Sequence, residues 1–519
     1  MRAFIHPLFL SVVLLSVLNA CGTTGSRQDD AVTTGPGTTT VTDTDDRQDS
    51  RYHQQRDSSA RSLAVVARLS RSMIGYQPEV ALEILRALES VPSGQLATMI
   101  DNPFQDPELT GWLELSLIAR TTLINDRSVS AAARAWANEH DGHVITREIF
   151  PELLTHYKAL FPVPAQVAIL LPTQGGLAAA AKAIRDGILA AYLEQPGESV
   201  IRFYASGETS ESALAAYMQA REDGAMQIIG PLRIGSTRAL SSMEDQVVPV
   251  LLLNEPSEVQ QYDQQRTSIV SSLSLSQTEE AAAIAGKALA QGQKQALVLV
   301  PDNAWGTRIE TAFSTVFEDG DGNIAATSRF NRAANDQSAM LTQLLRIDQS
   351  KQRKTDLQSL LGVPLTFEPR RRNDFDFVFL AATPAEGREL KPLLRFHNAG
   401  DIPVYAMGRV YSGAVERTAD RDLNDIIFPS TPWQLQAASE TTMLPDSVRG
   451  GTFGNLYALG QDAWRLLPWI PLMQKDPDLW FAGNVGALRL RTDGRMYREP
   501  AWAKFSSGRP LPYQWPGTY

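Results

Sequence analysis

The residue patterns that most often carry catalysis are incomplete in this sequence. The chain has no Gly-x-Ser-x-Gly element that would present a nucleophilic serine, and neither Ser-x-x-Lys nor Lys-Thr-Gly occurs. An α/β-hydrolase or a serine acyltransferase that uses these motifs would therefore lack its nucleophile. We expect no catalytic residue in this chain.

Two patterns have the residue types of a metal site without its spacing. His140 and His143 lie close in sequence, but His-Glu-x-x-His is absent, so we interpret both as solvated residues at a helix end. Asp319–Ile324 resembles part of a calcium-binding loop. Alignment on its second glycine puts Phe317 and Ser328 at the first and twelfth positions, where charged ligands belong. A turn before a strand is the better interpretation, and we expect no metal.

The single cysteine, Cys21, has the clearest chemical role. It follows an apolar run, Leu8 to Leu18, that is far shorter than the roughly 20 residues of a membrane-spanning helix. With Arg2 ahead of the run, residues 1–20 have the layout of a cleavable secretory signal. Leu18-Asn19-Ala20-Cys21 resembles the bacterial lipobox, whose cysteine is acylated on sulfur. We therefore predict that Cys21 is lipidated; the alternative is an unprocessed buried thiol.

Composition limits the remaining choices. The chain has 519 residues and a net charge of −10, from 48 basic and 58 acidic residues. This acidic balance argues against a general nucleic-acid binder, which needs a basic face. A lone cysteine excludes an internal disulfide and Cys-rich metal sites. Gly22 is not the aspartate that retains many lipoproteins at the inner membrane, which favours an outer-membrane anchor facing the periplasm.

The N-terminal half changes character at two places. Residues 21–60 are almost devoid of apolar side chains and are predicted to be a disordered tether, because such a segment cannot offset its ordering entropy. Residues 61–162 show apolar residues at helical spacing and no strand-like alternation. We expect a small all-helical domain there, built as a TPR-like array of paired helices. A plain helical bundle is the alternative.

Residues 163–519 alternate between apolar strand patterns and helix patterns, which is typical of a doubly wound parallel sheet. The strands form two sets, and a Ser-rich extended link at residues 268–275 is predicted to cross between two lobes around a cleft. The predicted strands are Val167–Leu171, Ser199–Tyr204, Met226–Ile229 and Val248–Leu253, then Ala296–Val300, Ile324–Phe330, Phe375–Ala381 and Val404–Met407. Thr492–Arg495 is predicted to be the turn of a hairpin.

Several segments of this region carry a family resemblance. Gln166–Pro172, followed by Gly175-Gly176 and an Ala-rich helix, opens the region like the leucine-binding group of periplasmic solute-binding proteins. More specific segments are Ile229–Leu232, Val298–Pro301 with Trp305-Gly306, Arg370–Asp374, Phe396–Ala406, Arg409–Gly413, Ala419–Asn424, Thr431–Trp433 and Leu459–Ala463. Together they resemble the penicillin-binding-protein activator family, LpoA, over nearly all of residues 165–519. The helical region is shorter than is usual for that family.

The resemblance implies a function and a fold. Members are outer-membrane lipoproteins that stimulate a bifunctional peptidoglycan synthase, a class A penicillin-binding protein. The implied fold is a helical TPR-like domain followed by a two-lobed α/β domain of the periplasmic-binding-protein type I class. Besides the lipid on Cys21, the resemblance implies no cofactor.

In solute-binding relatives, loops at the carboxyl ends of the strands hold an amino-acid ligand. The corresponding loops here contain few groups that would grip a carboxylate, because Pro231 has no N–H and Leu232 has no hydroxyl. Two interpretations remain: the cleft retains a ligand, or it is repurposed or empty. The possible cleft-lining residues are Thr173, Gln174, Gly175, Leu232, Asn254, Trp305 and Tyr411.

Two basic segments stand out in an acidic protein, Lys351–Lys354 and Arg370–Arg372. They are interpreted either as solvated loops or as a surface that steers the protein toward an acidic patch on its partner. On the second interpretation Arg370, Arg371 and Arg372 are possible partner-docking residues.

The sequence therefore favours a non-enzymatic activator of a class A penicillin-binding protein, anchored in the outer membrane. The alternative is a lipid-anchored periplasmic receptor for amino acids or cell-wall fragments. A wall hydrolase would need a catalytic set that the sequence does not offer.

Overall fold

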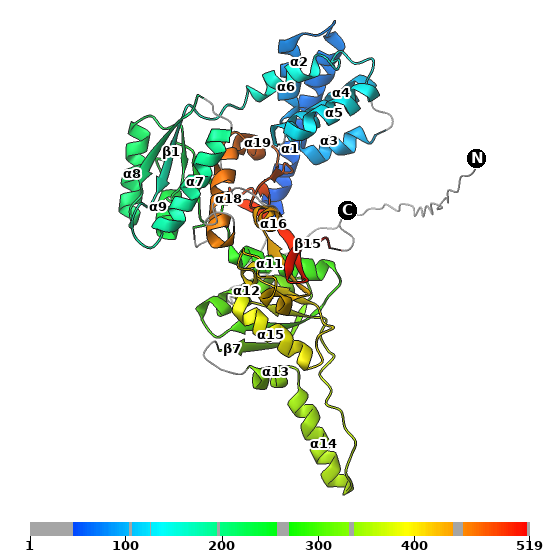
Figure 1. Cartoon of the computed structure of the whole chain (residues 1–519). Helices are drawn as coiled ribbons and strands as arrows, with labels where there is room; N and C mark the ends of the chain where they lie inside the picture. The colour runs from blue at the N-terminus through cyan, green and yellow to red at the C-terminus, as the bar shows by residue number, and fades with distance from the viewer. Residues whose placement is uncertain are drawn as a thin grey trace, which may run out of the picture. The chain divides into compact units, whose positions relative to one another are not determined.

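The computed structural model describes residues 45–102, 106–124, 126–194, 198–256, 269–331, 337–439 and 450–515 (Figure 1). The chain divides into two units, residues 1–55 and residues 56–519. The first unit is described only from Asp45 onward, as the start of a helix. In the described part of the chain, no helix is both long enough and apolar enough to cross a membrane.

A helical domain comes first. Its helices are α1 (Asp45–Ser72), α2 (Pro78–Leu88), α3 (Ser93–Ile100), α4 (Pro107–Ile124), α5 (Asp126–Glu139) and α6 (Phe150–Lys158). Apolar residues at helical spacing on α2, α4 and α6 form one core around Trp112 and Phe150. The predicted all-helical domain is confirmed, although α3 was not predicted because it is short and follows a proline.

The tether prediction for residues 21–60 falls largely outside the described residues. From Asp45 onward, however, the structure has α1, so the prediction is wrong for the last part of that range. The physical reason is that a lack of apolar residues excludes burial, not helix formation. Arg and Gln, which recur in this stretch, are good helix formers.

The first lobe is a parallel five-stranded sheet in the order β2-β1-β3-β4-β5. Its strands are β1 (Gln166–Leu171), β2 (Val200–Ala205), β3 (Gln227–Ile229), β4 (Val250–Leu252) and β5 (Val270–Ser272). The helices α7 (Ala178–Glu194), α8 (Ser210–Glu222) and α9 (Ile234–Ser241) connect them. The predicted crossover at 268–275 thus contains the fifth strand of this sheet. Val270, Ser271 and Ser272 of this segment pair with β4 in parallel register.

The second lobe has a seven-stranded sheet in the order β15-β14-β10-β9-β8-β6-β7. Its parallel strands are β6 (Gln295–Pro301), β7 (Asn323–Phe330), β8 (Phe377–Leu380), β9 (Val404–Ala406) and β10 (Ile426–Ser430). Two antiparallel strands, β14 (Ala501–Ser506) and β15 (Arg509–Pro512), continue the sheet from β10. The helices are α11 (Gln277–Ala290), α12 (Ala304–Asp319), α13 (Ser338–Leu344), α14 (Ile347–Leu361), α15 (Pro384–Phe396) and α16 (Pro432–Ser439).

The chain returns to the first lobe before it ends. The helices α18 (Gly451–Arg465) and α19 (Ile470–Lys475) join the first core, as does a small sheet of β11 (Phe481–Ala482), β12 (Ala487–Leu490) and β13 (Met496–Glu499). α18 and α7 are in close contact at Gly187 and Gly460. A Cβ added at either glycine would lie only 2.0 or 2.1 Å, respectively, from a backbone oxygen of the other helix, so only glycine fits there. The predicted hairpin around Thr492–Arg495 is confirmed by the β12–β13 pairing. The two-lobed α/β domain is confirmed, with more connections between lobes than the one predicted.

A buried ion pair joins the helical domain to this returning segment. Arg120 of α4 is 1% exposed, and its guanidinium contacts the carboxylate of Asp476, which is fully buried at the end of α19. The same carboxylate accepts a 2.6 Å hydrogen bond from the Ser93 hydroxyl. The guanidinium also donates to the carbonyl of Val91 at 2.9 Å. The Nε of Arg120 is buried without a hydrogen-bond partner among the described residues. Removal of either partner of this pair would leave the other charge buried and uncompensated, which is strongly destabilising.

His143 corrects the interpretation of both histidines as solvated. Its side chain is 8% exposed and lies between Trp112 and Trp136, with both ring centroids 5.0 Å from its own. Nδ1 accepts a hydrogen bond from the backbone N–H of Ile145 at 3.1 Å. Burial, helped by the neighbouring His140, lowers the pKa of His143 to about 4. The domain is therefore built around a neutral imidazole.

We expect the substitution Arg120→Met to lower the free energy of unfolding by about 3–5 kcal/mol, because it leaves the Asp476 carboxylate buried without a counter-charge. Urea unfolding followed by tryptophan fluorescence measures this. The control Lys182→Met removes an exposed partner of Asp186 and should cost no more than about 0.5 kcal/mol. An equal loss of unfolding free energy in the two variants would show that the buried pair stabilises the fold no more than the exposed pair does.

We expect His143 to make the fold acid-sensitive. The pKa of His143 is about 4 in the folded chain, against its ordinary value of 6.5 in the unfolded chain. Between pH 6.5 and 4 the unfolded chain therefore binds a proton at this residue that the folded chain does not bind. Stability is therefore fully present above pH 6.5 and is lost as the pH falls toward 4, by up to about 3 kcal/mol. His143→Gln should reduce this loss in unfolding curves measured across that range. An unchanged pH dependence in the variant would contradict the assignment.

Candidate functional site

A cavity of about 680 Å³ lies at the carboxyl edge of the second lobe's sheet. Turns after β9 and β10 supply part of its wall, as expected for ligand sites of parallel sheets. The starts of α11 and α18, with Arg498 on β13, supply the rest. Polar residues that line it are Gln277, Glu280, Arg409, Ser412, Ser430, Thr431, Gln434, Asn455 and Arg498. We take this cavity as the cleft that the two-lobed fold predicts.

Glu280 is the acidic residue among those that line the cavity. Its carboxylate accepts a 2.7 Å hydrogen bond from the backbone N–H of Gly408 and lies 3.9 Å from the guanidinium of Arg498. Burial raises the pKa of Glu280, while Arg498 and the Gly408 N–H act in the opposite direction. Because its partners belong to the protein, Glu280 holds the turn after β9 in place and does not present a free charge to a ligand.

Other polar groups of the cavity are also paired with each other. The Thr431 hydroxyl donates to the amide oxygen of Asn455 at 2.8 Å, which ties the end of β10 to α18. The indole N–H of Trp305 donates to Gln277 at 2.8 Å, and the guanidinium of Arg409 lies 5.2 Å from the indole ring centre. Trp305 was predicted to line the cleft. It contacts Gln277 and Arg409, which line the cavity, but it is not itself one of the lining residues. Its polar atom is already used.

Tyr411 lines this cavity but is mainly a core residue. It is 5% exposed and packs against Phe428 and Phe505. Burial raises the pKa of its phenol, and its hydroxyl has no hydrogen-bond partner among the described residues. The prediction that Tyr411 lines the cleft stays a prediction as far as any ligand contact is concerned.

The predicted cleft residues of the first lobe do not join Tyr411. Gln174 and Gly175 are exposed in the turn after β1. Leu232 is 6% exposed, and its carbonyl accepts a hydrogen bond from the side chain of Asn254 at 3.2 Å. The amide oxygen of Asn254 accepts a hydrogen bond from the backbone N–H of Glu255. These side chains hold the loop after β4 to the loop after β3.

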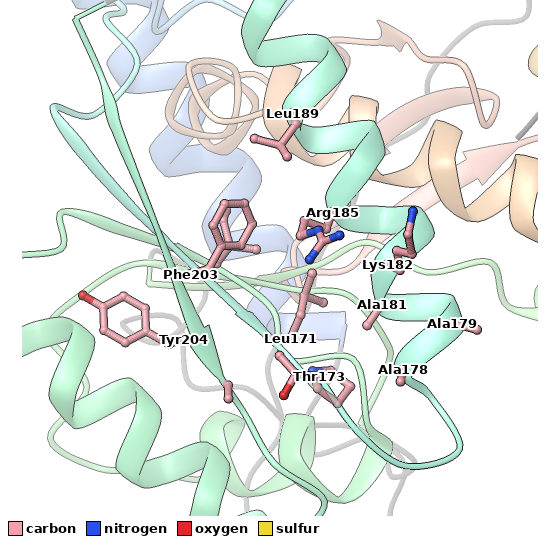
Figure 2. Close-up of a pocket in the computed structure, with 13 residues that line it drawn as sticks. Leu171, Thr173, Ala178, Ala179, Ala181, Lys182, Arg185, Leu189, Phe203 and Tyr204 are labelled. Carbon is pink, nitrogen blue, oxygen red and sulfur yellow. The ribbon is translucent and has the colours of Figure 1, made fainter. Parts of the chain in front are cut away.

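Thr173 lines a second cavity, of about 770 Å³, between α7 and β2 (Figure 2). Its wall is mostly apolar and includes Leu171, Leu189 and Phe203, and the last of these is 46% exposed. Lys182 and Arg185 of α7 also line it, and Figure 2 shows the Arg185 side chain extending toward Phe203; both cations contact Asp186. The cavity is thus a mostly apolar groove whose two cations are partly neutralised, and it lies apart from the Tyr411 cavity.

The three candidate docking arginines have different surroundings. Arg371 donates to Asp401 at 2.9 Å, and Arg372 makes two hydrogen bonds to Asp374, at 2.6 and 2.9 Å. Arg370 is exposed. The other basic segment, Lys351–Lys354, lies on α14. Cys21 lies outside the described residues.

One group of potential metal ligands occurs in the described part of the chain: Glu114, Glu139 and His140, with ligand atoms within 4.8 Å of one another. His140 Nε2 lies 2.8 Å from the Glu114 carboxylate. This single contact accounts for the grouping, because a histidine next to a carboxylate is an ordinary hydrogen-bonded pair.

Sequence reasoning missed most of the cavity wall. Gln277, Asn455 and Arg498 come from segments far apart in the sequence, and the last two belong to the part of the chain that returns to the first lobe. No local motif marks them. Arg409 and Thr431 could have been found, since each follows a predictable strand end.

The sequence of this chain is similar to a known protein family over most of its length. The model of the family described as "LppC putative lipoprotein" matches residues 58–508. The penicillin-binding protein activator LpoA of Vibrio cholerae is 28% identical over 415 residues, and the match covers 77% of this chain and 66% of that protein. LpoA of Vibrio antiquarius is 26% identical over 444 residues, with 82% and 71% covered. The chain thus spans about two thirds of the length of these relatives.

Two solved structures share the fold. Haemophilus influenzae LpoA has a TM-score of 0.54 at 20% identity, covering 86% of this chain and 76% of that one. The C-domain of the same protein, described as a regulator of PBP1A, has a TM-score of 0.51 at 20% identity, covering 67% of this chain and all of that one. The family match runs through both the helical domain and the two lobes, so the chain belongs to the LppC family of lipoproteins, the family of the LpoA activators.

Proposed function

We propose that this protein binds a class A penicillin-binding protein in the periplasm and stimulates its cross-linking activity, without catalysing a reaction itself. The observation that carries this proposal is the family match over residues 58–508 together with relatives named penicillin-binding protein activators. The C-domain structure described as a regulator of PBP1A adds support, because its fold corresponds to the two lobes.

The geometry of the cleft agrees better with a protein scaffold than with a solute receptor. Glu280 and Thr431 each hydrogen-bond to another part of the wall, and Glu280 has Arg498 nearby. Gln277 accepts a hydrogen bond from Trp305, behind the wall. A receptor for a charged solute needs polar groups that are free to exchange water for ligand. Wall-to-wall pairing instead stabilises the contacts between the second lobe, α18 and β13.

Activation sets an energetic condition. The activator must bind the active conformation of the synthase more tightly than the inactive one, because a ligand shifts an equilibrium only by its differential affinity. A partner with a fixed shape can meet this condition without losing binding energy to its own rearrangement. The buried pair between Arg120 and Asp476 supplies that rigidity between the helical domain and the first lobe.

The anchor is part of the same proposal. A lipid on Cys21 would hold the N-terminus in the outer membrane, and the chain that follows would let the folded domains approach a synthase of the inner membrane. Residues 22–44 could span on the order of 75 Å if fully extended. α1 and the rest of the helical domain would add to that reach.

We expect the soluble chain from Gly22 to increase peptide cross-linking by a purified class A penicillin-binding protein several-fold, because it selects the active conformation. Cross-linked muropeptides formed from lipid-linked substrate are the measurement. A monofunctional transpeptidase without a class A glycosyltransferase domain is the control. No stimulation, with no co-purification of the two proteins, would contradict the proposal.

The rival proposal is a receptor for amino acids or cell-wall fragments, favoured by the 680 Å³ cavity and its arginines. Calorimetric titration of the soluble chain with free amino acids and with purified muropeptides separates the two. Micromolar binding without any effect on the synthase would favour the receptor.

We expect Cys21→Ala to leave an unprocessed precursor that does not fractionate with the outer membrane, because the residue that receives the lipid is lost. Metabolic labelling with a fatty acid, followed by membrane fractionation, is the measurement. The control substitution Ser26→Ala should leave both the processing of the precursor and its membrane fractionation unchanged. Normal outer-membrane fractionation of Cys21→Ala would refute the anchor.

A further inference from the structure

A helical arm projects from the second lobe. It consists of α14 and the segment that returns from it, residues 347–370, and Figure 1 shows α14 leading away from α13 and α15. With its 15 residues, α14 is about 22 Å long. The function proposed above does not account for the outer part of this arm.

The foot of the arm is firmly attached. The backbone N–H of Arg372 donates to the carbonyl of Leu345 at 2.9 Å, which holds the two ends of the arm together. The Arg372 side chain is 5% exposed and binds Asp374 through two hydrogen bonds. This arginine is the first cause of the lowered pKa of Asp374. The neighbouring Arg371 binds Asp401. Both arginines therefore fix the direction of the arm.

The outer part of the arm has no core of its own. Beyond Ser350, every residue of α14 is exposed or half-buried. One contact with the returning segment is the ammonium of Lys354 over the ring of Phe367, at 5.7 Å. A helix of this length is marginal in water unless an apolar face is buried. The outer half of α14 has such a face, and its own fold does not cover it.

That face is a stripe of leucines. Leu357, Leu360 and Leu361 follow the i, i+3, i+4 spacing, so they lie on one side of the helix. They are 49%, 80% and 56% exposed. Monomeric proteins leave single apolar residues on their surface, but a contiguous apolar group at the end of a projecting element marks a contact site.

Charge adds a second feature to the stripe. Arg353 lies one turn before Leu357 on the same side, and Lys354 lies beside it. Asp356 accepts a hydrogen bond from the Gln352 amide at 2.8 Å and borders the stripe, one turn before Leu360. The stripe therefore presents cations and leucines together, in a protein whose net charge is −10.

We propose that this stripe, Arg353, Lys354, Leu357, Leu360 and Leu361, is the element with which the protein docks on its partner. The partner surface it fits is an apolar groove with acidic residues at one end, which receives the helix as an i, i+3, i+4 ligand. The inference rests on the proposed function, because it takes the penicillin-binding protein as the owner of that groove.

A protein groove fits the arm better than a lipid surface does. Helices that lie on membranes carry their cations on the polar face, opposite the apolar one. In α14, Arg353 lies in line with the leucines, and the acidic Asp356 borders the stripe one turn before Leu360. This arrangement suits a groove whose acidic group lies along its length. Attraction between the arm and that group would speed association and would weaken as salt is added.

The test uses the full soluble chain from Gly22 and a purified class A penicillin-binding protein. The double variant Leu360→Ser/Leu361→Ser should bind at least about tenfold more weakly, since buried apolar anchors dominate such interfaces. Leu193→Ser is the matched control, because Leu193 is a 67% exposed leucine on α7 of the first lobe. Circular dichroism checks that each variant is folded.

Charge is tested separately. Arg353→Glu should slow association and reduce its dependence on salt, measured by surface plasmon resonance at two salt concentrations. Arg308→Glu makes the same change at an exposed position of α12 and should leave both quantities unchanged. The cross-linking assay should show a loss of stimulation in the arm variants that parallels the loss of affinity.

The outcomes separate the inference from the function on which it rests. If the wild-type chain binds the synthase and the leucine variant binds equally well, the arm is not the docking element and the proposed function stands. If the wild-type chain does not bind at all, both fail. Binding of the wild-type chain to phosphatidylglycerol vesicles, lost in the leucine variant without any change in synthase affinity, would assign the arm to a lipid surface and overturn the inference.

Discussion

The arrangement of the folded domains depends on one buried ion pair. Arg120 brings a full positive charge into the space between the helical domain and α19, where Asp476 is its counter-charge. The Ser93 hydroxyl and the carbonyls of Leu88 and Val91 also hydrogen-bond to the pair, and only the Nε of Arg120 has no partner among the described residues. Because the desolvation cost of such a pair is recovered only in one geometry, the helical domain and the first lobe are fixed to each other rather than loosely linked. Such rigidity would reduce the binding energy that the protein loses to its own rearrangement when it binds a partner.

Much of the fold could be predicted because its signals are local. The apolar run Val167–Leu171 indicates a strand buried on both faces, and the strand is observed at Gln166–Leu171. The strands β14 and β15 were missed, as was the return of α18 to α7, because these depend on pairings between residues far apart in sequence. Gly187 and Gly460 illustrate the difficulty: each is an unremarkable glycine until the other helix is placed against it.

The candidate site could be predicted only in outline. Rules for parallel sheets placed a cleft at the strand ends, and the cavity beside Arg409 and Thr431 lies there. The rules do not say which side chains point into it. Thr173 turned out to line a different groove, and Tyr411 to pack mainly in the core. Arg371 and Arg372 were recognised as unusual from their charge alone. Only the structure shows that they hold the foot of a helical arm and leave its leucines exposed.

The proposed function and the proposed docking element together require direct contact between the α14 arm and a peptidoglycan synthase. Amine-reactive cross-linking of the soluble chain to a membrane-embedded class A penicillin-binding protein, read by mass spectrometry, measures this contact. Cross-links are expected from Lys351 and Lys354 of the arm, in preference to the exposed Lys182 of the first lobe. Cross-links that arise only from other lysines, or none to the synthase at all, would contradict it.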